Sequence, residues 1–250
     1  MIKNAISLAF GLAIIIAPGW THADLVGEWL FSGNANDTSG NGQHGSIFGA
    51  TSATDRFGNP SAAYDFSPSN SSYIDLPSGF LPVGAGPISY SLWVNPRNNS
   101  GLDHRLIHHG GFAAGQGFNL YINENAYRLD YFGTQYFDFD DTVQGQWQHL
   151  ALVHDGIGHT FYLNGVETSS SNKALAIVAG NPMTLGRYPG GGFHYDGLMD
   201  DVRVYNHALS ASEVQQLAGI PEPSAWVFLV VVAVALLTCQ SRRNRGMLRL

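Results

Sequence analysis

The stretch "QWQHLALVHDGIGHTFYLNGVET", residues 146–168, decides the fold class. Its first apolar run ends at Asp155-Gly156, and its second run is followed by Asn164-Gly165. Asn-Gly is the strongest short-range hairpin signal, because both residues tolerate positive φ. The stretch therefore predicts three consecutive antiparallel strands joined by tight turns.

Other segments show the same period of two. Apolar residues alternate with other side chains in "PISYSLWVNP" (residues 87–96) and "GFNLYIN" (117–123), which is typical of a strand with one face in a core. Short runs of this kind recur between Gly, Asn, Asp and Pro residues along the chain. One segment differs: in "ALSASEVQQLAG" (208–219), Ser210 and Glu213 form a capping box, and Gly219 closes the predicted helix. The pattern predicts an all-β sandwich with one short C-terminal helix.

The first 23 residues have the features of a secretory signal peptide. Lys3 precedes an apolar stretch from Ala5 to Ala17, and the small residues Thr21 and Ala23 suit cleavage after Ala23. We therefore expect residues 1–23 to be removed on export. The domain would then begin at residue 24.

Composition narrows the range of partners. The formal net charge is −7, and five of the twelve Lys and Arg residues lie outside residues 24–219. The domain is thus more acidic than the whole chain and offers no basic patch for phosphates, so we expect no nucleic-acid partner. The single cysteine, Cys239, lies in the tail, so the domain has no disulfide.

Two oxygen-rich segments suggest a calcium site. In "GLMDDVRVYN" (197–206), strict alternation would place Asp200 on the same face as Val202 and Val204, where a carboxylate needs a partner. Near the start of the domain, "FSGNANDTSGNGQHG" supplies Asp37 and Asn41. Oxygen ligands of this kind suit calcium if the first and last strands are neighbours. The alternative is an Asx-turn at Asp37 and a hydrogen-bonded or Arg-paired Asp200.

The glycine-rich loop "GRYPGGGFHYDG" (186–197) is a candidate ligand-binding site. It presents the aromatic residues Tyr188, Phe193 and Tyr195, whose flat rings can stack on sugars or anchor a partner protein. The alternative is that these rings fold back over the edge of the sandwich.

The chain lacks the usual sequence patterns of catalysis. Glycosidases on β-sandwiches need two carboxylates at a fixed separation, and none of the five glutamates lies in a Glu-x-Asp-x-x-Glu arrangement. No Gly-x-Ser-x-Gly elbow is present either. We expect a non-catalytic protein; the alternative is a weak glycan-active enzyme, a glycosidase or lyase, that uses aspartates.

The order of these blocks resembles a laminin G-like, concanavalin A-like jelly-roll domain over residues 24–219. The most specific block is "GLMDDVRVYNHALSASEVQQLA", and "ISYSLWVNP" and "QWQHLALVHDGIGHTFYLNGVE" precede it in the expected order. The resemblance implies a two-sheet antiparallel jelly-roll sandwich. Such domains often hold a structural calcium ion, and they bind glycans, proteins or lipids or serve as spacers.

The tail, residues 220–250, resembles a PEP-CTERM sorting signal. The triplet is Pro221, Glu222 and Pro223, an apolar run follows, and the basic end is Arg242, Arg243 and Arg245. The resemblance implies a hydrophobic sorting helix that enters the membrane at least transiently and is processed by an exosortase-type enzyme. The alternative is a permanent anchor. We therefore expect an exported protein of the bacterial cell envelope or extracellular matrix that binds an exopolysaccharide or a cell-surface protein.

Overall fold

The computed structural model describes residues 25–79, 81–98, 101, 103–131, 136–174, 176–179 and 181–219. The predicted signal peptide and the predicted sorting segment lie outside these residues. Within the described ranges, no helix is long and apolar enough to span a membrane.

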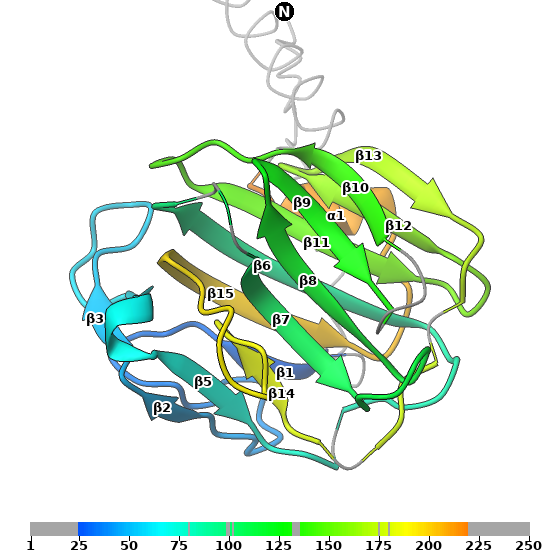
Figure 1. Cartoon of the computed structure of the whole chain (residues 1–250), viewed down its shortest axis with the longest axis horizontal. Coiled ribbons are helices and arrows are strands. Elements are labelled where there is room, and N and C mark those ends of the chain that lie inside the picture. The colour runs from blue at the N-terminus through cyan, green and yellow to red at the C-terminus, as the bar shows by residue number, and fades with distance from the viewer. Residues whose placement is uncertain are drawn as a thin grey trace, which may run out of the picture.

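The described residues form two antiparallel sheets packed face to face (Figure 1). The eight-stranded sheet has the order β13-β12-β11-β6-β15-β4-β3, with β1 paired to β15. Its strands are β1 (Leu25–Trp29), β3 (Thr51–Ala53), β4 (Ala63–Phe66), β6 (Ile88–Pro96), β11 (Gln148–His154), β12 (His159–Leu163), β13 (Val166–Ser171) and β15 (Gly197–Tyr205).

The seven-stranded sheet has the order β10-β9-β8-β7-β14-β5-β2 and lies in front in Figure 1. Its strands are β2 (Ser46–Phe48), β5 (Tyr73–Leu76), β7 (His104–Gly110), β8 (Gly117–Asn123), β9 (Ala126–Asp130), β10 (Tyr136–Asp141) and β14 (Met183–Leu185). A short 3-10 helix, η1 (Pro68–Asn70), connects β4 to β5.

The predicted three-strand unit is confirmed as β11, β12 and β13. Asn164 and Gly165 have φ values of 49° and 78°, as the hairpin turn between β12 and β13 requires. At the preceding turn, the Asp155 carboxylate accepts hydrogen bonds from the amides of Ile157 and Gly158, both at 2.8 Å.

The core lies between the sheets, and strand alternation builds it. The predicted inward residues of β6 are all buried: Ile88, Tyr90, Leu92 and Val94. From the opposite sheet, β8 contributes Phe118, Leu120 and Ile122. Each of these side chains contributes about 1.5–3 kcal/mol when it is removed from water. The all-β sandwich predicted from the sequence is confirmed.

Helix α1 (Ala211–Leu217) covers the outer face of the eight-stranded sheet. The capping box is present: the Ser210 amide donates to the Glu213 carboxylate at 2.7 Å, and the Glu213 amide donates to the Ser210 hydroxyl at 3.3 Å. Val214 is fully buried in a small cluster with Ala151 and Tyr205 from the sheet. The helix therefore stays on the sheet through one apolar face and a defined first turn.

Strand β15 corrects the alternation predicted for Asp200. The strand pairs with β6 on one side and with β4 and β1 on the other, so the first and last described strands are neighbours, as expected. A β-bulge interrupts its register between Asp200 and Arg203, and Asp201 has a φ of 49°. Because of the bulge, Asp200 lies opposite Trp93 on the outer face and does not share the inward face of Val202.

Candidate functional site

The outer face of the seven-stranded sheet carries a row of buried polar side chains. On β8, Phe118 and Leu120 point into the core, so Asn119 and Tyr121 point the other way. Arg105 from β7 and Asp130 from β9 lie beside them, and all four side chains are buried. Buried polar groups outside the core must be covered by another part of the chain.

Arg105 organises this polar floor. Its Nη1 atom lies 2.7 Å from Asp130 Oδ2, and its Nη2 atom lies 2.8 Å from Asp103 Oδ2. Its guanidinium sits 4.1 Å from the centroid of the Tyr121 ring. Asn119 Nδ2 donates to the other oxygen of Asp130 at 2.8 Å. Both carboxylates are therefore held by the guanidinium, and the floor is rigid.

His108 extends the floor beneath an aromatic ring. Its side chain is fully buried, with Nδ1 3.1 Å from Asn119 Oδ1 and Nε2 3.2 Å from the Gly110 carbonyl. Burial lowers the pKa of His108, and hydrogen bonds that its ring donates to Asn119 Oδ1 and to the Gly110 carbonyl oppose this effect. The imidazole stacks on Phe112, with centroids 5.2 Å apart and an interplanar angle of 8°. His108 is thus a support for Phe112.

Three rings cover the floor, and we call Phe112, Tyr188 and Phe193 the aromatic cap. The ring centroid of Tyr188 lies 6.1 Å from that of Phe112 and 6.2 Å from that of Phe193. Both pairs are edge to face, with an interplanar angle of 80°. Phe112 is 45% exposed and Phe193 is 43% exposed. The cap therefore presents apolar ring surface to solvent while its rings hold one another in place.

Backbone hydrogen bonds fix the loop that carries Tyr188 and Phe193. The Arg105 amide donates to the Phe193 carbonyl at 3.0 Å, and the Gly186 amide donates to the Leu106 carbonyl at 3.0 Å. A Cβ added at Gly190 would lie 2.4 Å from the Tyr188 ring, so this glycine lets the ring lie against the backbone. The loop is anchored to β7.

The structure separates the three aromatic residues predicted as ligand contacts. Tyr188 and Phe193 belong to the aromatic cap. Tyr195 is fully buried, and its ring centroid lies 5.9 Å from that of Phe66. Its hydroxyl donates a hydrogen bond to the Leu198 carbonyl at 3.1 Å. Its ring therefore faces the core instead of a ligand. Phe112 was missed in the sequence, although its flanking glycines in "GGFAAGQG" (110–117) resemble those around Phe193.

The predicted calcium ligands Asp37 and Asn41 lie in one hydrogen-bonded loop. Asp37 accepts from the backbone amides of Glu28, Ser39 and Gln43 at 2.9–3.0 Å. Burial raises the pKa of Asp37, but these hydrogen bonds outweigh it and bring the pKa below its ordinary value. Asn41 donates its amide to the Leu25 and Val26 carbonyls, both at 3.0 Å.

Asp200, the third predicted ligand, has a different set of partners. Its Oδ2 atom is 2.8 Å from Arg56 Nη1, and its Oδ1 atom accepts from the Asp201 amide at 2.7 Å. Burial, reinforced by the charge of Asp201, raises the pKa of Asp200 to about 7, although Arg56 lowers it.

The oxygens of Asp37 and Asp200 thus already accept N–H donors, and a guanidinium is a poor neighbour for a cation. No group of three or more His, Cys, Asp or Glu residues that could hold a metal occurs within the described ranges. A shared calcium ion remains a prediction.

Comparison with known proteins identifies the fold family. Residues 68–215 match the concanavalin A-like lectin/glucanase superfamily. One similar structure is domain 4 of AbnA, an extracellular arabinanase from Geobacillus stearothermophilus, which was solved with arabinotriose. Its sequence is 25% identical to this chain, the TM-score is 0.63, and the match covers 78% of this chain and 98% of that domain. The ligand-binding domain of botulinum neurotoxin serotype D, solved with N-acetylneuraminic acid, has a TM-score of 0.63 at 14% identity over 79% of this chain and 51% of the other.

Among curated proteins, 84 residues are 36% identical to the adhesion G-protein coupled receptor V1 of Danio rerio. That segment is 32% of this chain and only 1% of the receptor, so nothing about the activity of this chain follows from the receptor. The superfamily match, by contrast, spans more than half of the chain and all of the strands from β5 to β15. The chain belongs to the concanavalin A-like lectin/glucanase superfamily.

Proposed function

We propose that this chain is an exported, non-catalytic glycan-binding protein whose aromatic cap is the platform for a sugar. The observation that carries the proposal is the cap itself: partly exposed rings fixed above a rigid polar floor. The C–H face of a sugar ring packs on such rings, and the polar groups at the edge of the platform orient its hydroxyls.

The comparisons support a glycan as the ligand class. The domain of AbnA that resembles this chain was solved with arabinotriose, and the neurotoxin domain of the same fold was solved with N-acetylneuraminic acid. Fold alone does not fix a ligand, so the support rests on the cap together with these complexes.

Phe193→Ala tests the proposal. In a glycan array followed by calorimetry, we expect the variant to bind its glycan at least tenfold more weakly than the wild type, since a tenfold loss corresponds to about 1.4 kcal/mol. Ile157→Ala is the matched control, because Ile157 is 72% exposed and lies in the turn between β11 and β12. Equal binding by Phe193→Ala and wild type would refute the role of the cap.

Absence of catalysis is part of the proposal. It is supported by the missing carboxylate pattern and by the geometry of the floor, where Asp103 and Asp130 are both paired with Arg105. The measurement is release of reducing ends from the bound polysaccharide during a long incubation. Turnover that is lost on an Asp→Asn substitution without loss of folding would favour the glycosidase or lyase alternative.

Export and sorting complete the proposal. The signal peptide at residues 1–23 and the sorting segment at 220–250 support placement in the cell envelope or extracellular matrix, with an exosortase-type enzyme as a processing partner. Mass spectrometry of the mature C-terminus tests this placement. An intact Leu250 would favour the permanent anchor.

A further inference from the structure

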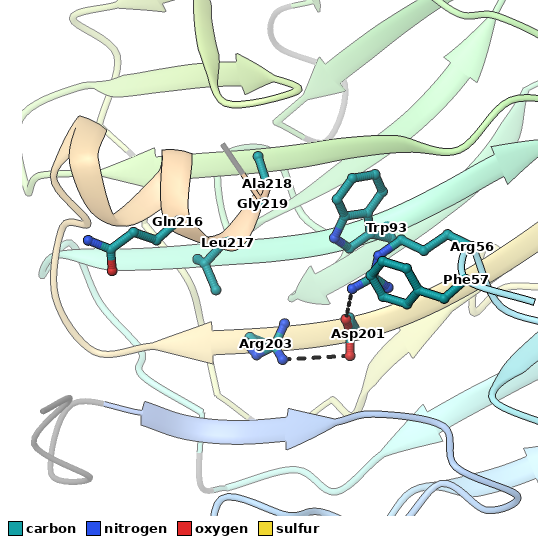
Figure 2. Close-up of a pocket in the computed structure, with 9 residues that line it drawn as sticks. All are labelled: Arg56, Phe57, Trp93, Asp201, Arg203, Gln216, Leu217, Ala218 and Gly219. Carbon is teal, nitrogen blue, oxygen red and sulfur yellow. Dashed lines mark hydrogen bonds and ion pairs between the residues drawn. The ribbon is translucent and has the colours of Figure 1, made fainter. Parts of the chain in front are cut away.

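A pocket lies on the side of the sandwich opposite the aromatic cap, and Figure 2 shows the residues that line it. Its volume is about 520 Å³, within the range of small-ligand sites. It opens on the outer face of the eight-stranded sheet, beyond the end of α1. We call it the Trp93 pocket; its lining includes Arg56, Phe57, Trp93, Asp201, Arg203 and Leu217.

Arg56 forms a preorganised wall of this pocket. Figure 2 shows its side chain between two rings, and its guanidinium lies 4.4 Å from the centroid of Phe57 and 4.6 Å from that of Trp93. The same guanidinium pairs with Asp200 at 2.8 Å and with Asp201 at 2.5 Å. The bulge in β15 makes this double pairing possible, because it turns two consecutive carboxylates to one face.

The loop that carries Arg56 and Phe57 is itself fixed. The carboxylate of Asp55 accepts hydrogen bonds from the amides of Phe57 and Asn59, both at 2.8 Å, and from the Asn59 side chain at 2.8 Å. A loop closed on itself in this way holds Phe57 in position without help from a ligand, so little order would have to be gained on binding.

The charged side chains around the Trp93 pocket are already paired with one another. Besides Arg56, the pocket contains Arg203, which pairs with Glu28 at 2.8 Å and with Asp201 at 3.6 Å. Two guanidiniums thus face three carboxylates, those of Glu28, Asp200 and Asp201. An anion would meet these carboxylates, and a cation would meet the guanidiniums. Because each of these charges already has a partner, the pocket favours a neutral ligand.

The remaining surface suits a ligand with an apolar face and oxygen acceptors. Phe57 is 74% exposed, the largest exposed fraction among the large apolar side chains of the described residues. Trp93 Nε1 is buried and has no hydrogen-bond partner within the part of the chain that the structure describes. Because this donor is buried, a hydroxyl or ring oxygen would satisfy it only after the indole ring moves, whereas a C–H face would cover the exposed Phe57 ring directly.

We infer that the Trp93 pocket is a second sugar-binding site that takes a neutral sugar residue, which makes the domain bivalent. The inference rests on the proposed function, since it assumes that the protein binds glycans. Two sites on opposite outer faces could hold two chains at once, so one protein molecule would cross-link a polysaccharide without any partner.

Nuclear magnetic resonance titration of the isotope-labelled protein tests the inference. The ligands are the neutral trisaccharides arabinotriose, cellotriose, mannotriose and galactotriose, each to 10 mM, with N-acetylneuraminic acid as the acidic comparison. The readout is the indole N–H resonance of Trp93, assigned with Trp93→Phe. We expect at least one neutral trisaccharide to shift it in a saturable way, and the acidic sugar to bind at least fivefold more weakly there.

Variants separate the two sites. Phe57→Ala should weaken binding at the Trp93 pocket at least fivefold and leave the aromatic cap unchanged, whereas Phe193→Ala should do the reverse. Ile157→Ala is the control for loss of an exposed apolar side chain, and melting temperatures establish that each variant is folded. If a trisaccharide binds at the cap but none of the four shifts the Trp93 resonance, the second site is refuted and the proposed role of the cap stands. A Trp93 response without binding at the cap overturns only the proposed role of the cap.

Discussion

His109→Gln should make the stability of the protein less sensitive to acid. His109 is buried against Tyr90, whose hydroxyl lies 2.6 Å from Nδ1, and against Phe118. Burial, with a smaller contribution from His108, lowers the pKa of His109 from 6.5 to about 3. The unfolded chain therefore binds a proton below pH 6.5 that the folded chain does not, and the stability contributed by neutral His109 is lost as the pH falls.

The magnitude follows from the two pKa values. At pH 4.5 the unfolded histidine is protonated and the folded one is not, so the difference corresponds to about 3 kcal/mol. Urea unfolding at pH 7.5 and pH 4.5 measures it. The loss of unfolding free energy between these two pH values should be about 3 kcal/mol smaller in His109→Gln than in the wild type. Any cost of the substitution that is independent of pH cancels in this difference.

Tyr90→Phe is the control for this experiment. It removes the hydroxyl that contacts Nδ1 but keeps the imidazole buried, so overall stability should fall while the dependence on pH persists. If His109→Gln and the wild type lose the same free energy between pH 7.5 and pH 4.5, burial of this imidazole is not a source of acid sensitivity and the reasoning fails.

Three further predictions concern other parts of the sandwich. Asp200→Asn should change the pH dependence in the opposite direction. A carboxyl whose pKa is about 7 in the folded protein stabilises the fold in acid, and this contribution is lost as the pH rises. The variant should therefore lose less free energy of unfolding than the wild type between pH 5 and pH 8, as measured by urea unfolding. Calcium at millimolar concentration should raise the melting temperature over that in chelator if Asp37, Asn41 and Asp200 hold an ion, and an unchanged melting temperature would argue against the site. Ser210→Ala should cost about 1 kcal/mol of unfolding free energy, because it removes the capping box of α1; a loss below the precision of urea unfolding would mean that packing of Val214 alone holds the helix.

Elements with a regular period could be predicted from the sequence, and irregular ones could not. The inward residues of β6 and the turn at Asn164-Gly165 follow from local rules, and both are confirmed. The bulge in β15 does not, because it places a non-glycine residue, Asp201, in the left-handed region. A single inserted position reverses the face of every residue on one side of it, and this moved Asp200 out of the core.

The candidate sites were only partly predictable for a related reason. Tyr188 and Phe193 could be found because glycines surround them, and the same signal wrongly favoured Tyr195, which belongs to the core. Phe112 lies more than 70 residues before Tyr188, and only the pairing of β7 with β14 brings their loops together. The Trp93 pocket likewise joins residues that are over 140 positions apart, such as Arg56 and Asp201.

The position of β15 bears on how this domain can be made. Synthesis delivers a chain from its N-terminus, yet β15, which joins β6 to β4 and β1, is the last of the fifteen strands in the described ranges to emerge. Until residue 205 is available, the eight-stranded sheet consists of separate pieces with unpaired edges, and Arg56 lacks its partners Asp200 and Asp201. Completion of the sheet thus depends on contacts of very long sequence separation, and pairing of this kind is typical of domains that fold slowly. If the chain is exported as we propose, slow closure of this sheet would leave it unfolded for long enough to pass through a translocation channel.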